Sequence, residues 1–265
     1  MSTLGCIGCG NMGSAILKGL HGKDGLSLAG YNRSAAKLEQ LQRDVPLHVA
    51  VSASELARVA DYIVLAVKPA QVAQVLQEIA PELTPDKVII SVAAGVTQAA
   101  LREDSGGICP VVRCMPNTPA MVGEGIFAMC FDDPALLPAC REEIEALFSG
   151  IGTVLALEES KFGAFTAVAG CGPAYVFHFM EAVIEAAVTT GFTRKDATDM
   201  VVQLFKGSVA LAEQSGQHIS VLREQVCSPA GVTITAVNHL DRTAVRGHII
   251  DAVLLARQRD REMSK

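Results

Sequence analysis

A glycine-rich segment near the beginning of the chain, Gly8-Cys9-Gly10-Asn11-Met12-Gly13, indicates the fold more specifically than any other segment. It follows a short apolar run over residues 4–8 that is typical of a β-strand, and it opens a helical pattern over residues 11–20. In such a strand–turn–helix the first glycine permits the tight turn, the second lets the backbone approach a pyrophosphate, and the third allows close helix–strand packing. The free N–H groups at the helix start favour an anion. The segment therefore predicts a dinucleotide-binding domain, and an ordinary glycine-rich turn is the alternative.

Strand-like runs alternate with helical patterns over residues 1–157. The expected strands cover residues 4–8, 27–31, 62–67, 88–92, 111–115, 126–131 and 153–157, and the expected helices include 11–20, 35–43, 70–80 and 135–148. The run over 62–67 is apolar throughout, as in a parallel sheet that is covered on both faces. We therefore expect an α/β fold whose N-terminal domain, residues 1–157, is a Rossmann-like, doubly wound parallel sheet.

The strand signal stops at Glu158, and the rest of the chain is helical in pattern. Thr193 with Asp196 resembles a capping box for a helix over 194–213. Segments 174–190, 196–212 and 243–261 carry few charges on most faces, so they must bury more than one side against each other or against a second subunit. We expect residues 158–265 to form an all-helical domain that dimerises and binds the substrate.

The end of the second expected strand indicates which nicotinamide cofactor is used. NAD sites place an Asp or Glu there for the ribose hydroxyls, whereas this chain has Tyr31-Asn32-Arg33-Ser34. Arg33 can pair with a 2′-phosphate, and Asn32 and Ser34 can add hydrogen bonds. This pattern favours NADPH over NADH, unless Arg33 is only a solvated surface residue.

Two further strand ends carry residues that could line the cofactor site. Ala66-Val67-Lys68-Pro69 closes the apolar run at the edge where such sheets bind ligands, so Lys68 either contacts the cofactor or is simply the last polar residue of the strand. Ser91-Val92-Ala93-Ala94-Gly95 ends the next strand in small residues, which leave room for a flat nicotinamide ring but also occur at tight packing.

Composition and charge exclude several classes of function. The net charge is −6 and no stripe of Lys and Arg is interleaved with aromatic residues, so we expect no nucleic-acid partner. Half of the residues are hydrophobic, yet no segment approaches the roughly 18–20 apolar residues of a membrane span, so we expect no membrane. A signal peptide would begin with positively charged residues, but no Lys or Arg precedes Lys18. We therefore expect the protein in the cytoplasm.

The eight cysteines are expected to be reduced, buried small hydrophobes. Cys6 and Cys9 form a Cys-x-x-Cys, but no second pair of cysteines or histidines completes a metal site. No metal is therefore expected.

A second segment with the chemistry of a binding site lies far downstream, at Cys227-Ser228-Pro229-Ala230-Gly231-Val232-Thr233. Ser228 suits a helix N-cap and Pro229 the first helical turn, so that the amides of Ala230 to Thr233 would face outward. Such a helix start has the right size for one carboxylate, and a plain capped helix is the alternative.

Six landmarks in order along the chain resemble the pyrroline-5-carboxylate reductase family. They are the Gly8–Gly13 loop, Ala66 to Pro69, Ala93-Ala94-Gly95-Val96, Arg113 to Pro119, Gly170-Cys171-Gly172-Pro173-Ala174-Tyr175, and Ser228 to Thr233. The resemblance covers nearly the full length. It implies NADPH-dependent reduction of 1-pyrroline-5-carboxylate to L-proline, the last step of proline biosynthesis. It also implies homodimers interlocked through the C-terminal helices, and often higher oligomers.

The resemblance also implies roles for individual residues. The cofactor contacts that carry over are Gly8, Gly10, Asn11, Met12, Gly13, Ser34, Ala66, Val67, Lys68 and Ala94. Ser228, Gly231, Val232 and Thr233 would cradle the substrate carboxylate and ring nitrogen, close to the nicotinamide of the partner subunit. We expect the Thr233 hydroxyl to hydrogen-bond the ring nitrogen and Ser228 to support the loop, as the two catalytic positions.

Four positions depart from the family pattern, and other functions stay open. Ala53 stands where the family commonly has an Asn near the adenosine end of the cofactor. Cys171 stands where the family has Ser, Ala169 also replaces a Ser, and Ala230 stands where the family has Gly. The alternatives are another Rossmann reductase, of a hydroxy acid or of the six-membered imine, and a non-catalytic nucleotide sensor.

Overall fold

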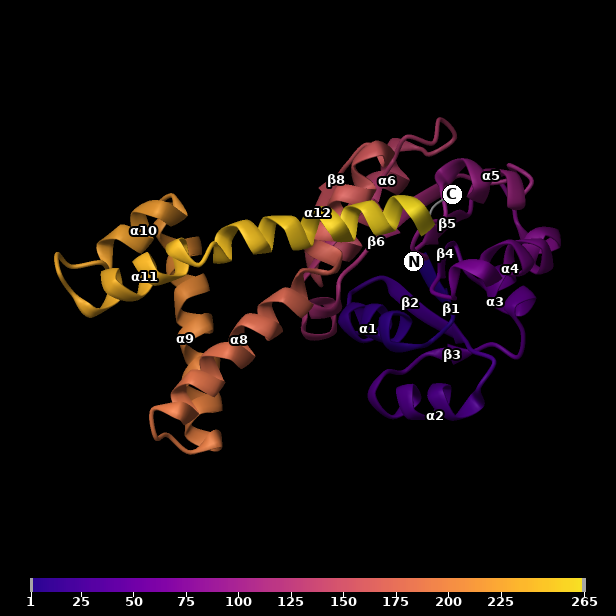
Figure 1. Ribbon diagram of the computed structural model, residues 1–265. Helices are drawn as coiled ribbons and strands as arrows, with labels where there is room; N and C mark the ends of the chain where they lie inside the picture. The colour runs from indigo at the N-terminus through magenta and orange to yellow at the C-terminus, as the bar shows by residue number, and fades with distance from the viewer. Residues whose placement is uncertain (1, 264–265) are drawn as a thin grey trace. The chain divides into compact units, whose positions relative to one another are not determined.

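An eight-stranded, mostly parallel sheet organises the first of the two units into which the chain divides (Figure 1). The computed structural model describes residues 2–263. The first unit extends to Cys171 and includes the end of the last helix from Arg257, and the second unit spans Gly172–Ala256. The strands are β1 Ser2–Ile7, β2 Leu26–Tyr31, β3 His48–Val49, β4 Tyr62–Leu65, β5 Val88–Ser91, β6 Val111–Met115, β7 Gly125–Cys130 and β8 Gly152–Ala156.

The strand order, β3-β2-β1-β4-β5-β6-β7-β8, confirms the Rossmann-like arrangement. The chain winds outward from β1 to β3 and then returns to β4 on the other side of β1. In open α/β sheets, ligands bind outside the carboxyl ends of the strands where the winding reverses. The fold therefore directs the search for a site to the ends of β1, β2 and β4.

The helices of the first unit cover the sheet. They are α1 Asn11–Leu20, α2 Ala35–Asp44, α3 Ala53–Val59, α4 Val72–Ile79, α5 Gln98–Asp104, α6 Pro138–Ser149 and α7 Phe162–Phe165. Successive residues of β4 enter different cores, because side chains alternate across a strand. Tyr62 and Val64 pack with α1 and α6 residues in one cluster, whereas Ile63 and Leu65 pack with α3 and α4 residues in another. The expected coverage of both faces is confirmed.

Two features of the sheet differ from the sequence prediction. The strand β3 was missed because two residues, His48 and Val49, are too short to show a period. The strand β7 runs antiparallel to β6, although a parallel sheet was expected. Residues 116–124 join these strands, and this segment is shorter than the dozen or so residues that a parallel crossover needs.

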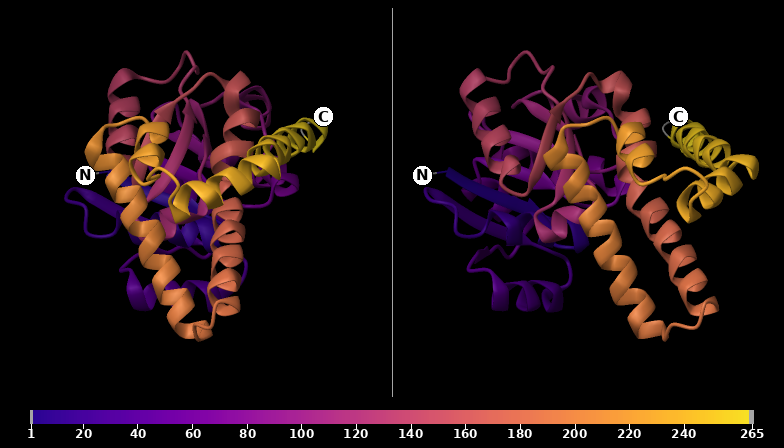
Figure 2. Two further views of the ribbon diagram at one scale, coloured as in Figure 1. Left: turned by 60° about the vertical axis from the view of Figure 1, so that its left-hand side comes forward. Right: turned by 90° about the vertical axis from the view of Figure 1, so that its left-hand side faces the viewer.

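The second unit is helical, as expected. Its helices are α8 Gly172–Thr189, α9 Arg194–Ser215, α10 Ile219–Gln225, α11 Val232–Arg242 and most of α12 Val245–Met263. Figure 2 shows α8 and α9 side by side in both views, joined by a short turn. The Thr193 hydroxyl accepts a hydrogen bond from the Asp196 amide at 3.1 Å, which confirms the predicted cap of α9. Phe179 of α8 meets Phe205 of α9 edge to face at 6.0 Å.

This helical unit has almost no core of its own. Among its described residues, Ala197 and Val201 alone are buried, while large apolar side chains such as Phe177 and Leu255 are exposed. A groove of about 710 Å³ between its helices is lined mainly by apolar side chains, among them those of Phe179 and Ile249. Because such surface is unfavourable in water, these helices need a covering partner.

One continuous helical stretch in the described chain, Glu159–Thr189, is long and apolar enough to cross a membrane by length and composition alone. Only 6% of its most apolar window is buried within the chain. The expectation that no segment approaches the length and apolar character of a membrane span is therefore wrong.

Candidate active site

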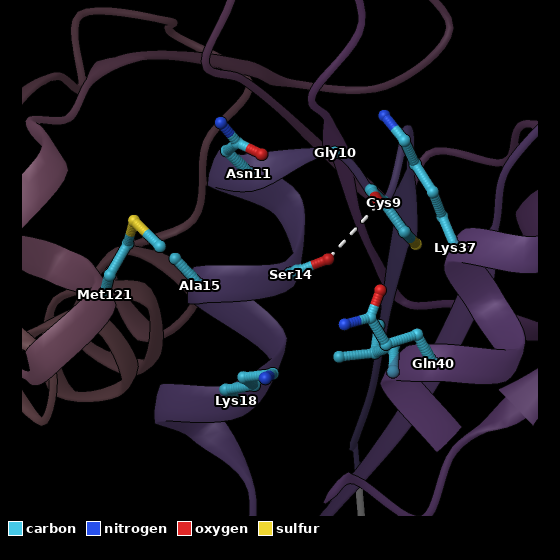
Figure 3. Close-up of a pocket in the computed structure, with 10 residues that line it drawn as sticks. Cys9, Gly10, Asn11, Ser14, Ala15, Lys18, Lys37, Gln40 and Met121 are labelled. Carbon is cyan, nitrogen blue, oxygen red and sulfur yellow. Dashed lines mark hydrogen bonds between the residues drawn. The ribbon is translucent and has the colours of Figure 1, made fainter. Parts of the chain in front are cut away.

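A cleft of about 690 Å³ lies at the carboxyl ends of β1, β2 and β4. It brings together half of the sixteen residues predicted from the sequence for the cofactor and the substrate. These eight are Gly8, Gly10, Asn32, Arg33, Ser34, Ala66, Val67 and Lys68. A smaller cleft of about 310 Å³ on the other side of Gly10 includes the predicted Asn11 (Figure 3).

The three glycines of the loop meet three different local requirements. Gly8 has φ of +99°, and a Cβ there would lie 2.6 Å from the Ala66 carbonyl oxygen. A Cβ at Gly13 would lie 2.3 Å from the Gly8 carbonyl oxygen and 2.8 Å from the Cys6 sulfur. A Cβ at Gly10 would meet nothing within 4 Å. Contacts within the protein therefore account for glycine at positions 8 and 13. At Gly10 the open space beside the Cα atom suits a ligand that the backbone approaches closely.

The start of α1 leaves its first amides available. Gly10 is the N-cap and supplies no side chain, and no acidic residue lies in the first turn. The first helical donor is the Ser14 amide, which donates to the Gly10 oxygen at 2.9 Å, and the Ser14 hydroxyl donates to the Cys9 oxygen at 3.2 Å (Figure 3). Within the described residues, the amides of Asn11, Met12 and Gly13 have no backbone partner, so they are free for an anion.

The end of β2 carries cations and no acid. The Asn32 amide nitrogen donates to the Ser34 oxygen at 3.0 Å, which shapes the turn into α2. Within the described part of the chain, Arg33 forms no ion pair, and its side chain is exposed. Lys37 follows one helical turn later and lines both clefts.

Lys37 was not predicted from the sequence. It lies in the first turn of α2, which begins two residues after Arg33, and both residues line the larger cleft. With Lys68 the larger cleft has three cations against one carboxylate, that of Glu78 from α4. Ala53 also lines the cleft, from the start of α3. The charge of this lining suits a ligand with several phosphates.

The remaining predicted cofactor residues lie outside the linings of these clefts. Met12 packs its side chain partly against the core, and Gly13 is buried, so each can offer only its amide. Ala94 is exposed in the loop between β5 and α5, next to Gly95, whose φ is +77°. That loop follows the carboxyl end of β5, the strand next to β4 in the sheet.

The Ser228 loop differs from its prediction. The helix α11 begins at Val232 with Gly231 as N-cap, so the predicted N-cap at Ser228 and helical Pro229 are wrong. Instead the Gly231 amide donates to the Ser228 oxygen at 3.0 Å and closes a turn. Ala230 has φ of +55° in this turn, a conformation that favours glycine. The amides left for an anion are therefore those of Val232 and its helical successors, not that of Gly231.

The hydroxyls on α11 divide into one that is used and one that is not. Thr235 donates its hydroxyl hydrogen to the Gly231 oxygen at 3.0 Å. Thr233 is exposed, and no hydrogen bond joins its hydroxyl to the part of the chain that the structure describes. Of the two, Thr233 is the one available to a ligand.

The Arg113–Pro119 landmark acts within the protein. The Asn117 side chain accepts from the Ile126 amide at 3.0 Å and donates to the Ala169 oxygen at 3.2 Å. Arg113 pairs with Glu159 at 2.9 Å and lies over the Phe162 ring. These side chains tie β6 to β7 and to the segment that follows β8.

The described cysteines are all free, and five of the eight are buried. The Cys6 thiol donates to the Gly8 oxygen at 3.9 Å, and the Cys9 thiol donates to the Cys6 oxygen at 3.6 Å. The interaction with the Cys9 side chain, together with burial, raises the pKa of Cys6, and the interaction with Cys6 lowers the pKa of Cys9. No group of three or more His, Cys, Asp or Glu that could hold a metal occurs in residues 2–263.

The fold and the loop at Gly8–Gly13 define a dinucleotide-binding oxidoreductase of the Rossmann type. A sequence model described as "NADP oxidoreductase coenzyme F420-dependent" matches residues 3–95, and one described as "Pyrroline-5-carboxylate reductase dimerisation" matches residues 159–263.

Relatives and solved structures match over the whole length. The chain is 36% identical to the pyrroline-5-carboxylate reductase of Escherichia coli (strain K12), across 99% of this chain and 98% of that protein. It is 34% identical to the Corynebacterium melassecola reductase, across all of both chains. The Coxiella burnetii reductase superposes with a TM-score of 0.92 at 33% identity, covering 100% of this chain and 99% of that one. The Plasmodium falciparum enzyme with NADP bound gives 0.89 at 32%, covering 100% and 98%. The chain belongs to the pyrroline-5-carboxylate reductase family, which confirms the resemblance seen in its motifs.

Proposed function

We propose that this chain catalyses the NADPH-dependent reduction of 1-pyrroline-5-carboxylate to L-proline, the last step of proline biosynthesis. The observation that carries the proposal is the full-length match to pyrroline-5-carboxylate reductases. It includes both chemically distinctive segments, the loop at Gly8–Gly13 and the loop from Ser228 to Thr233. A nucleotide sensor would have no need of the second.

The residues of the larger cleft, of the adjoining start of α1 and of the loop after β5 fit NADPH. The amides of Asn11, Met12 and Gly13 would hold the pyrophosphate beside the open face of Gly10. Arg33, with Asn32 and Ser34, would hold the 2′-phosphate, because an arginine fork matches a phosphate and no acid at the end of β2 repels it. Ala66, Val67 and Lys68 would line the ribose path, with Gly8 behind them, and Ala94 would face the nicotinamide. When bound, NADPH supplies the hydride for the imine carbon.

The substrate would be held by the start of α11. The amides of Val232 and Thr233 lie at the N-terminus of α11, where Gly231 as N-cap supplies no side-chain acceptor, so they would bind the substrate carboxylate. The free Thr233 hydroxyl would hydrogen-bond the ring nitrogen, and Ser228 would support the turn through its carbonyl oxygen. A protonated imine is already electrophilic, so orientation and electrostatics suffice and no strong protein acid is required.

The proposal includes a homodimer through the C-terminal helices. The family model for dimerisation spans the whole exposed apolar stretch Glu159–Thr189, and the helical unit buries almost none of its own apolar surface. A second copy of the chain is the partner that this combination favours, with higher oligomers built from dimers. The eight free cysteines support a reducing compartment, and we propose the cytoplasm.

Consumption of NADPH, followed by its absorbance, tests the proposal. Pyrroline-5-carboxylate, the six-membered imine and a β-hydroxy acid would be compared, each with NADPH and with NADH. We expect the highest kcat/KM for pyrroline-5-carboxylate with NADPH. Binding of NADPH without turnover of either imine would instead favour the sensor.

Two threonines on one helix give a matched pair for the substrate site. Thr233→Ala removes a hydroxyl that no described residue uses, whereas Thr235→Ala removes one that bonds the Gly231 oxygen. We expect kcat/KM for the imine to fall roughly 10- to 100-fold in Thr233→Ala, because a hydrogen bond to a charged group contributes about 1.5–3 kcal/mol. Thr235→Ala should change it much less. Wild-type kcat/KM in Thr233→Ala would refute the assignment.

A further inference from the structure

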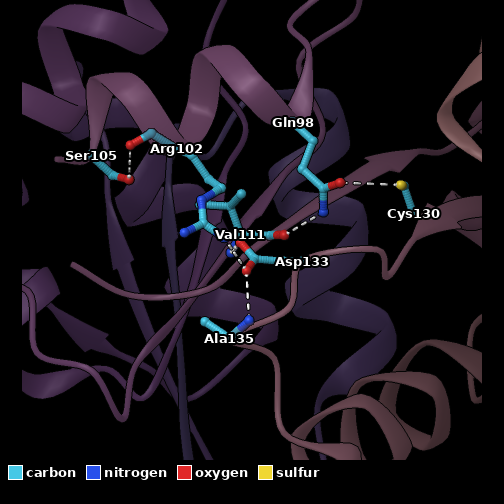
Figure 4. Close-up of polar contacts among 7 residues, drawn as sticks. All are labelled: Gln98, Arg102, Ser105, Val111, Cys130, Asp133 and Ala135. Carbon is cyan, nitrogen blue, oxygen red and sulfur yellow. Dashed lines mark hydrogen bonds and ion pairs between the residues drawn. The ribbon is translucent and has the colours of Figure 1, made fainter. Parts of the chain in front are cut away.

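The short helix α5 is held to its neighbours by polar side chains along its whole length (Figure 4). It follows the loop over residues 92–97 that extends β5. At its start the Gln98 side chain, 9% exposed, donates to the Val111 oxygen at 2.9 Å and accepts from the Cys130 thiol at 3.4 Å. These contacts tie the first residue of the helix to β6 and β7.

The other end of α5 is fixed by Asp133. Its side chain is fully buried, pairs with Arg102 of α5 at 2.6 Å, and accepts the amides of Val111 at 3.0 Å and Ala135 at 2.9 Å. Leu101 is buried between these contacts. The body of α5 is therefore anchored without help from the segment that follows β8.

Glu159 contacts only the start of this helix. One of its carboxylate oxygens accepts the Gln98 amide at 2.7 Å and the Arg113 guanidinium at 2.9 Å. Arg113 pairs with Ser91, the last residue of β5, across the sheet, and its guanidinium stacks on Phe162 at 4.6 Å. Glu159 thus joins the end of the loop after β5 to the neighbouring strand.

That loop offers few side chains with which to hold a ligand. Ala93 is buried, Ala94 is exposed and carries only a methyl group, and Gly95 takes a left-handed conformation. The position of any ring beside Ala94 is therefore set by the course of the loop backbone. At its helix end this backbone is held by the Thr97 cap, whose hydroxyl accepts the Ala100 amide at 3.2 Å, and by Glu159.

We infer that Glu159 is a positioning residue for the nicotinamide end of NADPH, acting through the Gln98 amide and the loop that carries Ala94. The inference rests on the proposed function for its consequence in turnover. Hydride transfer requires the reacting carbons at near-contact distance, and a displacement of about 1 Å can cost roughly 100-fold in rate. The phosphates of NADPH would contribute most of its affinity, and the proposed function places them at the ends of β1 and β2, away from Glu159.

Three variants separate this role from simple stabilisation. Glu159→Ala removes the acceptor, Glu159→Gln retains an oxygen for the Gln98 amide, and Glu145→Ala removes a carboxylate of similar exposure from the ion pair with Arg141 on α6. Where Glu159→Ala fails to fold, Glu159→Asp replaces it, since its shorter side chain draws the carboxylate away from Gln98.

The first measurement is hydrogen exchange in residues 92–98 of the protein without cofactor. We expect Glu159→Ala to accelerate exchange there roughly tenfold or more, because the Gln98 amide loses its acceptor. Exchange in α1 should stay unchanged, and Glu145→Ala should behave as wild type. The second is the fluorescence lifetime of bound NADPH, which should shorten as the ring gains mobility, while its Kd changes less than about threefold.

The third measurement is turnover of the imine, where we expect kcat to fall roughly 10- to 100-fold in Glu159→Ala and to recover largely in Glu159→Gln. Wild-type exchange and lifetime in Glu159→Ala would overturn the inference. So would equal losses of kcat and NADPH affinity, or a Glu159→Gln enzyme no better than Glu159→Ala. A wild-type enzyme inactive on the imine would defeat the proposed function instead, while exchange and lifetime would still decide the role of Glu159.

Discussion

Alanine at Gly10 and alanine at Gly13 should separate the two duties of the glycine-rich loop, which are binding a phosphate and packing a helix on a strand. Both substitutions add one methyl group to the same turn. At Gly13 the methyl carbon would lie 2.3 Å from the Gly8 carbonyl oxygen, about 1 Å inside an ordinary contact. At Gly10 nothing lies within 4 Å.

The magnitude at Gly13 follows from what can move. The clashing atom belongs to the backbone of Gly8, whose amide is bonded to the Tyr31 oxygen at 2.8 Å and whose own position is confined by Ala66. Overpacking of this kind costs about 1–3 kcal/mol, and the better helix propensity of alanine returns at most about 1 kcal/mol. We expect Gly13→Ala to lower the free energy of unfolding by about 1–2 kcal/mol, and NADPH affinity to fall with the distorted loop.

The expectation for Gly10→Ala is the reverse. Gly10 has φ of −79° and ψ of −158°, which alanine adopts readily, so the free energy of unfolding should change by less than about 0.5 kcal/mol. If a pyrophosphate occupies the open space, the Kd for NADPH should rise at least about tenfold, or 1.4 kcal/mol. Denaturant unfolding without cofactor and fluorescence titration with NADPH measure the two quantities. Wild-type affinity in Gly10→Ala, or wild-type stability in Gly13→Ala, would refute the reasoning.

Three other substitutions test separate parts of the structure. Arg33→Ala should raise the Kd for NADPH at least about tenfold and leave the Kd for NADH unchanged, since a charge-assisted hydrogen bond contributes about 1.5–3 kcal/mol. Fluorescence titration with each cofactor measures both values, with Arg43→Ala as the control, and an equal loss of affinity for both cofactors would contradict the prediction. Asp133→Asn should lower the free energy of unfolding, measured in urea, by about 1–3 kcal/mol, because the new side-chain NH2 group would face the Val111 N–H where the carboxylate now accepts it. An unchanged urea midpoint would show that the hydrogen bonds of Asp133 are dispensable for stability. Ala230→Gly should raise that free energy by up to about 1 kcal/mol, because glycine relieves the left-handed conformation but has more freedom when unfolded; a loss of stability would show that the turn is not strained.

Most of the sheet could be predicted because its strands are buried on both faces and separated by amphipathic helices. The pattern located β6 correctly at Val111–Met115 and α1 at Asn11–Leu20, where an apolar period starts directly after a glycine turn. Strand direction is a different matter. Nothing in the apolar run over 125–130 states that β7 is antiparallel, since that depends on how far the preceding connection reaches.

The cofactor cleft could be predicted because the strand order of a Rossmann-like sheet determines which strand ends lie next to each other. The ends of β1, β2 and β4 meet at one edge of the sheet, so motifs far apart in the chain line one cleft. Lys37 was missed because it lies on a helix, where a single lysine carries no signal. Ser228 was assigned as an N-cap by residue type alone. The backbone decides otherwise, because Ala230 turns to positive φ and the helix cannot begin before Gly231.

The apolar surface of the stretch Glu159–Thr189 can be covered either by a lipid bilayer or by another protein surface. Its first turns are already committed to protein, since Phe162 and Phe165 are buried in a core cluster and Glu159 accepts the Gln98 amide. Further along, Glu185 forms an ion pair with Arg194 at the end of α8, and Glu181 lies one turn earlier. Carboxylates on a spanning helix would be costly in hydrocarbon, whereas at a subunit contact they can stay at the wet rim. The same stretch lies inside the match to the dimerisation model, so a second subunit accounts for an apolar surface that length and composition alone would assign equally to a membrane.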